Sequence, residues 1–256
     1  MQVVAVIPAR FGSTRFPGKP LANQTGKYLI QHVYERTLAA AKIDRCIVAT
    51  DDQRILDAVN AFGGHAVMTD PAHQSGTDRI AEVCRAVGSA PDDVILNVQG
   101  DEPEIEPDYL DCLAALLLDD PAVPMATLAC PFPPGADPAD PNRVKLVINS
   151  RNQALYFSRS LIPYPRERDD KTSWLLHLGV YAYRGSFLLE FAGWEAGALE
   201  RIEKLEQLRV LERGYPIAVA IVPRACAGVD TPDDYDNFVQ RWRMRQDPGD
   251  AISKIG

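Results

Sequence analysis

The chain has 256 residues, 46% of them hydrophobic and 24% charged, so it can bury a sizeable core beneath a charged surface. No window approaches ~18 apolar residues and the N-terminus lacks a signal-peptide pattern, so we expect a cytoplasmic protein without a membrane span. The net charge of −8 argues against nonspecific binding to nucleic acid, and five scattered cysteines without a CxxC pair argue against a disulfide framework or a zinc site.

The first half of the chain alternates short apolar runs with amphipathic segments. We expect strands at 3–7, 46–50, 65–68 and 94–98, and helices at 28–41, 53–62, 76–87 and 107–118. This alternation predicts βαβ units and an α/β fold with a Rossmann-like, mostly parallel sheet flanked by helices.

The middle of the chain has a different pattern. Five prolines between 131 and 141 predict a loop, and the runs at 144–148, 154–157 and 177–183 favour antiparallel strands. We therefore expect one domain over 1–256, with an antiparallel insertion at approximately 125–200. A helix at 199–213, a strand at 217–222 and a helix at 233–245 complete the prediction, and the tail after Asp247 is expected to be weakly ordered.

The loop at 8–20 carries the strongest local signal. Gly12 and Gly18 allow backbone N–H groups to approach phosphate oxygens. Positive charge comes from Arg10, Arg15 and Lys19, and no Asp or Glu precedes Glu35. The loop is neither a Walker A motif nor a GxGxxG fingerprint. A solvated basic loop is the alternative, but prolines and glycines this dense between a strand and a helix indicate a fixed shape.

A second signal is acidic. Asp101 directly follows a predicted buried strand, where a carboxylate is costly unless it is solvated or bound to a cation, and Mg²⁺ prefers oxygen ligands. Asp230 is the second candidate ligand, although it could instead cap the following helix. For Asp51 and Asp52 the capping interpretation is favoured.

The segment 73–79 places small residues at the start of a predicted helix. Such a segment suits contact with a base or sugar through backbone groups, and a plain helix cap is the alternative. Since ligands of open α/β sheets bind beyond the carboxyl ends of the strands, we expect 8–20, 51–52 and 99–103 to converge on one crevice.

Several stretches together resemble one known family. They are residues 7–21, HQSGTDR at 73–79, NVQGDEP at 97–103, ALYFSR at 154–159, HLGVYAY at 177–183, KLEQLR at 204–209 and GVDTP at 228–232. They resemble the 3-deoxy-manno-octulosonate cytidylyltransferases, a family with the nucleotide-diphospho-sugar transferase type of fold. The first loop is shared by many sugar nucleotidyltransferases, whereas the later stretches are specific to this family.

The resemblance implies an activity: CTP and 3-deoxy-D-manno-octulosonate (Kdo) give CMP-Kdo and pyrophosphate, which activates Kdo for lipopolysaccharide biosynthesis. It also implies Mg²⁺ as cofactor, CTP and Kdo as the partners, and a homodimer formed through the antiparallel insertion. Neither a nucleic acid nor a membrane is expected as a partner.

The resemblance also implies roles for individual residues. Lys19, Arg10 and Asp101 would be catalytic, and Asp101 and Asp230 would hold the metal. The nucleotide would be bound by Ala9, Arg10, Arg15, Lys19, Ser75, Gly76, Arg79 and Gln99. The sugar acid would be bound by Arg159, His177, Tyr181, Glu206 and Gln207.

Some alternatives stay open at this point. His177 is the titratable candidate for a general base, although a role in orienting the sugar is favoured. Without the resemblance, Glu206 would be assigned to a solvated helix face. A cytidylyltransferase for another sialic-acid-like sugar acid and a non-catalytic nucleotide-binding regulator are the competing functions. The combination of Asp101, Asp230 and Lys19 argues against the regulator.

Overall fold

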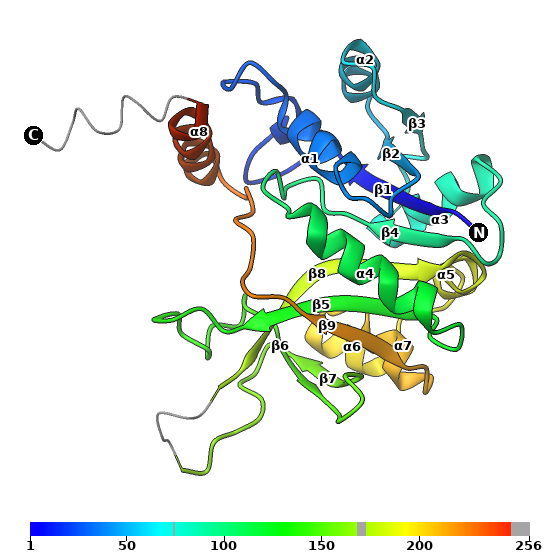
Figure 1. Ribbon diagram of the computed structural model, residues 1–256, viewed down its shortest axis with the longest axis vertical. Helices are drawn as coiled ribbons and strands as arrows, with labels where there is room; N and C mark the ends of the chain where they lie inside the picture. The colour runs from blue at the N-terminus through cyan, green and yellow to red at the C-terminus, as the bar shows by residue number, and fades with distance from the viewer. Residues whose placement is uncertain (74, 168–172, 247–256) are drawn as a thin grey trace, which may run out of the picture.

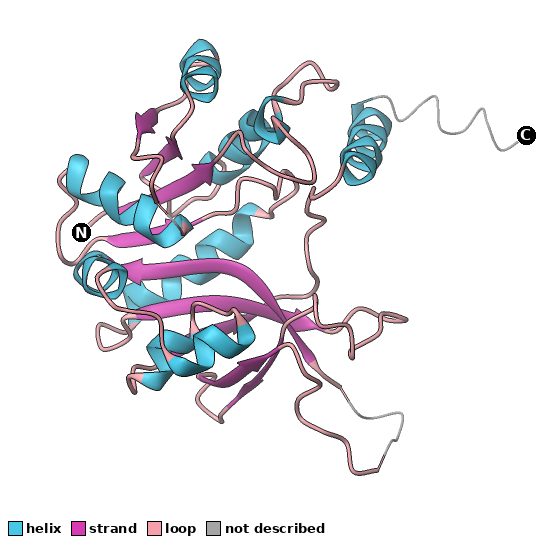
Figure 2. Ribbon diagram, turned by 180° about the vertical axis from the view of Figure 1, so that it is seen from behind, coloured by secondary structure: helices cyan, strands magenta, loops and turns pink. Residues whose placement is uncertain are grey.

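A computed structural model describes residues 1–73, 75–167 and 173–246 of the chain. Within these residues nine strands form one sheet, with the order β3-β2-β1-β4-β8-β5-β9, and β6 and β7 join it through β8. Helices lie on both sides of the sheet, as the two opposite views show (Figure 1, Figure 2). The α/β class is therefore confirmed, and the predicted tail after Asp247 lies outside the described residues.

The parallel half of the sheet is made of β1 (Val3–Ala9), β2 (Arg45–Thr50), β3 (Ala66–Met68) and β4 (Val94–Asn97). Its central strands are buried on both faces, which is why they read as continuous apolar runs in the sequence. In β1, alternate residues face opposite ways, so Ala5 joins one apolar cluster and Val6 joins the other. The helices α1 (Leu29–Leu38), α2 (Gln53–Ala61) and α4 (Pro107–Asp119) pack in the first cluster.

The second cluster is covered by α3 (Gly76–Ala86), α5 (Gly185–Ala192) and α7 (Leu208–Glu212). Helices on both faces are the arrangement that buries a parallel sheet. None of the helices in the described residues is long and apolar enough to cross a membrane.

The segment expected as an antiparallel insertion does supply antiparallel pairs. Its strands are β5 (Met125–Pro131), β6 (Lys145–Ile148), β7 (Ala154–Ser158) and β8 (Leu175–Arg184). However, β5 and β8 lie within the central sheet: β8 runs antiparallel to both β4 and β5, and β5 pairs in parallel with β9 (Ile217–Ile221). The segment is therefore continuous with the sheet that carries the N-terminal loop.

The expected single helix at 199–213 is wrong. The structure has two helices, α6 (Ala198–Glu203) and α7, separated by a turn. Lys204 adopts a left-handed backbone conformation with φ of 54° and closes α6, because its N–H donates to the carbonyl of Glu200. Strand β5 (Met125–Pro131) and helix α5 (Gly185–Ala192) were not predicted from the sequence.

The last helix, α8 (Pro232–Gln246), stands at the edge of the molecule (Figure 1). It packs through its own small apolar cluster rather than through the two larger ones, and the buried members are Leu29, Val229, Tyr235, Phe238 and Val239. This helix follows directly on the GVDTP stretch that carries Asp230.

Candidate functional site

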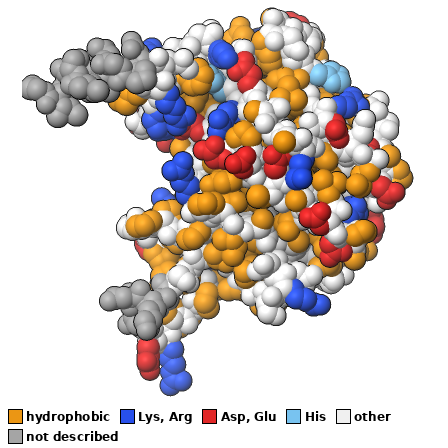
Figure 3. All heavy atoms as spheres, viewed as in Figure 1, with side chains coloured by type: hydrophobic (Ala, Val, Ile, Leu, Met, Phe, Trp, Pro, Cys, Tyr) orange, Lys and Arg blue, Asp and Glu red, His pale blue; other side chains and the backbone are white. Residues whose placement is uncertain are grey.

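The carboxyl ends of β1, β2 and β4 open onto a hollowed flank of the molecule. Figure 3 shows that Lys, Arg, Asp and Glu side chains gather on the upper wall of this hollow, whereas apolar side chains cover much of the lower wall. The expected convergence is confirmed for the first and third segments, because the Lys19 ammonium lies 3.0 Å from the Asp101 carboxylate.

The loop at 8–20 is folded around Phe11 rather than loosely solvated. The Phe11 carbonyl accepts hydrogen bonds from the backbone N–H groups of Ser13 and Gly18, and the Arg54 guanidinium lies 3.4 Å from the centre of the Phe11 ring. Gly18 has φ of 71°, and a Cβ at this position would lie only 3.1 Å from the same ring, so the backbone conformation requires glycine and the close ring favours it. The loop leads into a short 3₁₀ helix, η1 (Lys19–Leu21).

Lys19 is the centre of this crevice. Its Nζ donates to Asp101 Oδ2 at 3.0 Å and to the Val229 carbonyl at 2.7 Å, and it lies 3.7 Å from Asp230 Oδ1. Arg15 approaches Asp230 Oδ1 at 3.2 Å from the exposed side. Three segments far apart in sequence thus bring two carboxylates to one ammonium group, which is only 12% exposed.

Asp230 does not cap α8; Thr231 and Asp234 do so instead. Asp234 Oδ2 accepts from the backbone N–H groups of Asp230 and Thr231, and the Thr231 hydroxyl accepts from the N–H of Asp234. The Asp230 carboxylate is therefore left to face Lys19 and Arg15. Asp52 does cap its helix, as expected, because it accepts from the N–H of Arg54 at 3.0 Å.

The carboxylates fit a magnesium ion that is also held by a substrate. Mg²⁺ in nucleotide sites usually takes one or two carboxylates, with phosphates and water as the other ligands. In the described part of the chain no group of three or more His, Cys, Asp or Glu could hold a metal ion alone. Burial, and secondly the charge of Asp101, raises the pKa of Glu102 to about 8.

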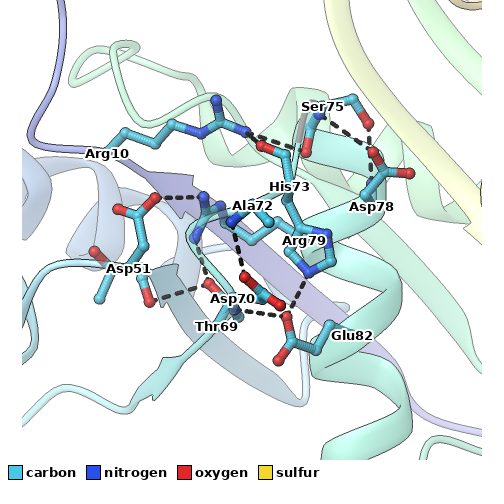
Figure 4. A network of polar contacts seen from close by, with 11 residues as sticks. Arg10, Asp51, Thr69, Asp70, Ala72, His73, Ser75, Asp78, Arg79 and Glu82 are labelled. Carbon is cyan, nitrogen blue, oxygen red and sulfur yellow. Dashed lines mark hydrogen bonds and ion pairs between the residues drawn. The ribbon is translucent and has the colours of Figure 1, made fainter.

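Arg10 and the first turn of α3 hold His73 and Ser75 in place (Figure 4). Arg10 donates to the carbonyls of His73, at 2.7 Å, and Ser75, at 3.5 Å. Ser75 and Asp78 form a capping box at the start of α3. A Cβ on Gly76 would lie 3.6 Å from the Pro8 ring, so the predicted nucleotide-binding residues Ser75 and Gly76 lie beside the start of the loop at 8–20.

Arg79 lies beneath this segment rather than on its open face. It is fully buried, donates to Asp51 Oδ2 at 2.6 Å and contacts the Thr69 hydroxyl (Figure 4). The guanidinium therefore ties the ends of β2 and β3 to α3. A nearby pair, His73 and Glu82 at 2.5 Å, supports the same segment, and sequence reasoning did not single out Glu82.

The predicted sugar residues His177 and Tyr181 lie on β8. His177 Nε2 is 3.0 Å from the Thr127 hydroxyl, and its ring centre lies 4.9 Å from that of Phe157 and 5.5 Å from that of Tyr181. Burial lowers the pKa of His177 to about 3. The imidazole is therefore neutral at physiological pH.

Glu206 and Gln207 lie in the turn between α6 and α7, not on a continuous helix. Glu206 Oε2 accepts from the Thr77 hydroxyl at 2.8 Å, which joins this turn to the first turn of α3. Burial raises the pKa of Glu206, and the hydrogen bond from Thr77 opposes that shift. Gln207 is 3% exposed, and its amide nitrogen has no hydrogen-bond partner among the described residues. Thr77 belongs to the HQSGTDR stretch, which was the only signal for it.

Gln99 and Arg159 have different surroundings. Gln99 donates to the carbonyl of Gly179 at 3.0 Å, so it connects the end of β4 to β8. Arg159 donates to the carbonyls of Glu203, at 2.7 Å, and Pro141, at 2.9 Å. The fully buried Lys145, which sequence reasoning missed, donates to the Arg159 carbonyl at 2.5 Å.

The chain is similar in sequence to known proteins. A sequence profile of the family described as cytidylyltransferase matches residues 4–219. A 3-deoxy-manno-octulosonate cytidylyltransferase of Syntrophotalea carbinolica is 52% identical over 242 residues, which cover 91% of this chain and 96% of the relative. The protein of the same name in Geobacter sulfurreducens is 46% identical and covers 95% of this chain and 100% of its own length.

Solved structures agree with these relatives. A structure of CMP:2-keto-3-deoxy-manno-octonic acid synthetase complexed with CTP superposes with a TM-score of 0.90 at 46% identity, covering 96% of this chain and 100% of that one. A cytidylyltransferase from Leptospira borgpetersenii has a TM-score of 0.60 at 16% identity and shares the fold.

Proposed function

The chain belongs to the 3-deoxy-manno-octulosonate cytidylyltransferase family, and on that premise we propose how its residues carry out the reaction. The enzyme joins CTP and Kdo to give CMP-Kdo and pyrophosphate. The product supplies Kdo for lipopolysaccharide biosynthesis. The observation that carries the proposed mechanism is the position of Lys19 between Asp101 and Asp230, at the mouth of a glycine-containing basic loop.

The nucleotide lies along the loop at 8–20. Backbone N–H groups of the loop, with Arg10, Arg15 and Lys19, hold the triphosphate oxygens, since guanidinium and ammonium groups form charge-assisted hydrogen bonds with phosphate. Ser75, Gly76 and Gln99 surround the cytidine, and Arg79 supports that segment from below. The proximity of 75–76 to Pro8 supports one continuous nucleotide site.

The reaction is an in-line displacement at the α-phosphorus. The anomeric hydroxyl of Kdo attacks, a new P–O bond forms, the bond to pyrophosphate breaks, and the hydroxyl proton leaves to solvent. Positioning and charge neutralisation supply most of the catalysis in phosphoryl transfer, and we extend this to nucleotidyl transfer. Lys19 stabilises negative charge on the α-phosphate and on the departing pyrophosphate.

Asp101 and Asp230 are the proposed ligands of the cofactor Mg²⁺. When bound there with phosphate oxygens, the ion would neutralise triphosphate charge and make the attacking hydroxyl more acidic. The two carboxylates approach the same Lys19 ammonium, at 3.0 Å and 3.7 Å, and this proximity supports their assignment to one metal site.

The sugar acid is held on the other side of the crevice. The planar guanidinium of Arg159 suits the Kdo carboxylate, while Tyr181, Glu206 and Gln207 form hydrogen bonds with its hydroxyl groups. The buried amide nitrogen of Gln207 has no hydrogen-bond partner among the residues that the structure describes. This supports the role, because such a donor is costly unless a ligand accepts from it. Neutral His177 orients the sugar.

A screen of pyrophosphate release tests the function directly. Purified enzyme with Mg²⁺ is offered CTP, UTP, ATP or GTP, each with Kdo or with sialic acid. We expect release only with CTP and Kdo. Release with sialic acid alone would assign another sugar acid, and no release from any pair would favour a non-catalytic nucleotide-binding protein.

Asp101→Ala tests the metal assignment. We expect pyrophosphate release from CTP and Kdo to fall at least about 100-fold, the scale of losing one major electrostatic contact, with an unchanged circular dichroism spectrum. Asp52→Ala is the control, because Asp52 follows β2 by two residues but caps α2, and it should keep most of the activity. Near-full turnover of Asp101→Ala with Mg²⁺ would show the assignment to be wrong.

We also propose that the enzyme is a homodimer formed through the segment at approximately 125–200 and that it acts in the cytoplasm. The exposed apolar side chain of Leu155 on β7, 59% accessible, supports an interface in this region.

A further inference from the structure

The loop after β4 carries a carboxylate, Glu104, that the mechanism does not use. Glu104 follows Asp101 by three residues and is only 8% exposed. Both of its oxygens accept hydrogen bonds from α8: Oε2 from Arg241, through Nε at 2.9 Å and Nη2 at 2.6 Å, and Oε1 from Arg245 at 2.6 Å. The loop that carries one proposed metal ligand is thus clamped to the helix that follows the other.

The same two segments are joined at a second place. The backbone N–H of Val229 donates to the Asp101 carbonyl at 2.8 Å, directly beside the two carboxylates. Glu104 binds the C-terminal half of α8, where Arg241 lies eleven residues beyond Asp230. In a helix, eleven residues span roughly 16 Å along the axis. The chain from Val229 to Arg245 is therefore fixed to the Asp101 loop at both ends.

We propose that Glu104 is a positioning residue for Asp230. By holding α8, it fixes the separation of Asp230 from Asp101 and thereby the affinity of the site for the divalent ion that accompanies CTP. This inference rests on the proposed function, in which both aspartates bind the metal.

The packing of α8 explains why a clamp matters. The helix buries only a small apolar cluster of its own and stands at the edge of the molecule (Figure 1). Its last turns carry Arg241, Arg243 and Arg245. Without the carboxylate, two of these guanidinium groups would lose their shared anion and repel each other. A tilt of the helix would then shift Asp230, and a shift on the order of 1 Å is enough to impair a positioned site.

The test compares two glutamates of the same loop. Glu104→Gln removes the clamp charge, while Glu106→Gln is the matched control, because Glu106 pairs with Arg36 of α1 at 2.6 Å rather than with α8. Mn²⁺ binding to the enzyme–CTP complex is measured by electron paramagnetic resonance, together with the Mg²⁺ dependence of turnover. We expect Mn²⁺ to bind about ten-fold more weakly to Glu104→Gln, a loss of about 1.4 kcal/mol, and almost normally to Glu106→Gln.

A double-mutant cycle shows whether the effect passes through Asp230. In an Asp230→Asn background, Glu104→Gln should cause no further loss of Mn²⁺ affinity. An equal loss in both backgrounds, an equal loss in Glu106→Gln, or no loss in Glu104→Gln would each overturn the inference. If Asp230→Asn alone leaves Mn²⁺ binding unchanged, it is the proposed metal site that fails.

The fold of each variant is checked by its thermal midpoint. Arg245→Ala is a second test of the clamp. Arg245 is 59% exposed, and its removal leaves the contacts between Glu104 and Arg241 in place. We expect a smaller loss of Mn²⁺ affinity in the same direction, and unchanged affinity in this variant would count against the clamp.

Discussion

One ammonium group organises the residues of the crevice. The Lys19 ammonium lies within 3.7 Å of Asp101, Asp230 and the Val229 carbonyl, although Lys19 and Val229 are 210 positions apart in the sequence. The residue types were predictable, because a basic loop and strand-end carboxylates are the usual components of a site for a nucleotide and Mg²⁺. Their mutual distances were not, since they depend on how β1, β4 and the segment before α8 come together.

His177 illustrates how burial decides a role. A general base works best with a pKa near the working pH, whereas burial lowers the pKa of His177 to about 3. The folded enzyme therefore keeps this imidazole neutral from about pH 5 to 9, and its proton uptake should not appear in the rate profile.

We expect His177→Gln to keep the pH dependence of kcat/KM while raising the KM for Kdo about ten-fold, because the ring orients the sugar without titrating. The measurement is a pH–rate profile of both enzymes at saturating CTP. The disappearance of an ionisation from the profile of the variant would identify His177 as the base.

At the scale of elements, the main wrong prediction was one continuous helix at 199–213, where the structure has a turn between α6 and α7. The sequence from 199 to 213 contains good helix formers, yet Lys204 adopts a left-handed conformation and ends α6. This break lets Leu205 reach the apolar cluster behind the sheet and places Gln207 with its amide buried. Tertiary packing and the glutamate contact to Thr77 outweigh helix propensity, which contributes less than about 1 kcal/mol per residue.

The packing of α1 against α8 has a pH dependence of its own. His32 of α1 lies with its ring centre 5.0 Å from that of Phe238 and 4.5 Å from that of Trp242, both on α8. Burial lowers the pKa of His32 to about 4, while Glu35 raises it and Lys27 lowers it to smaller extents. Because the unfolded chain takes up this proton more readily, the stability is complete above about pH 6.5 and is lost as the pH falls towards 4.

We therefore expect His32→Gln to unfold with a weaker dependence on pH in that window, with the wild type losing on the order of 2 kcal/mol more than the variant. Urea unfolding at a series of pH values measures this difference. His65→Gln is the control, because His65 is exposed, and it should follow the wild type. A parallel pH dependence in His32→Gln would contradict the assignment.

At the scale of the whole molecule, β8 unites the two halves of the site. It pairs with β4, whose end leads to Asp101, and with β5 and β6 of the antiparallel segment. The proposed nucleotide and sugar sides of the crevice are therefore attached to one sheet. Gln99 reinforces this connection through its bond to the Gly179 carbonyl.

The proposed homodimer makes a prediction at this same scale. We expect sedimentation equilibrium to give twice the chain mass of 28.2 kDa. Leu155→Glu should shift the protein towards the monomer, because a charge would be buried at the interface. Met68→Glu, at an exposed apolar position on the distant strand β3, should remain dimeric, and a wild-type monomer would refute the proposal.

The sequence by itself determined the alternating βαβ order, the basic loop around Gly18, the strand-end position of Asp101 and, through the resemblance of its motifs, the family. These properties reside in local periodicity and in short stretches that can be recognised without neighbours. Only the tertiary structure decided that Arg79 ties the ends of β2 and β3 to α3, that Gln207 lies in a turn, and that Glu104 holds α8. Each of these depends on partners from distant segments, and burial rather than residue type sets whether a polar group supports the fold or faces a ligand.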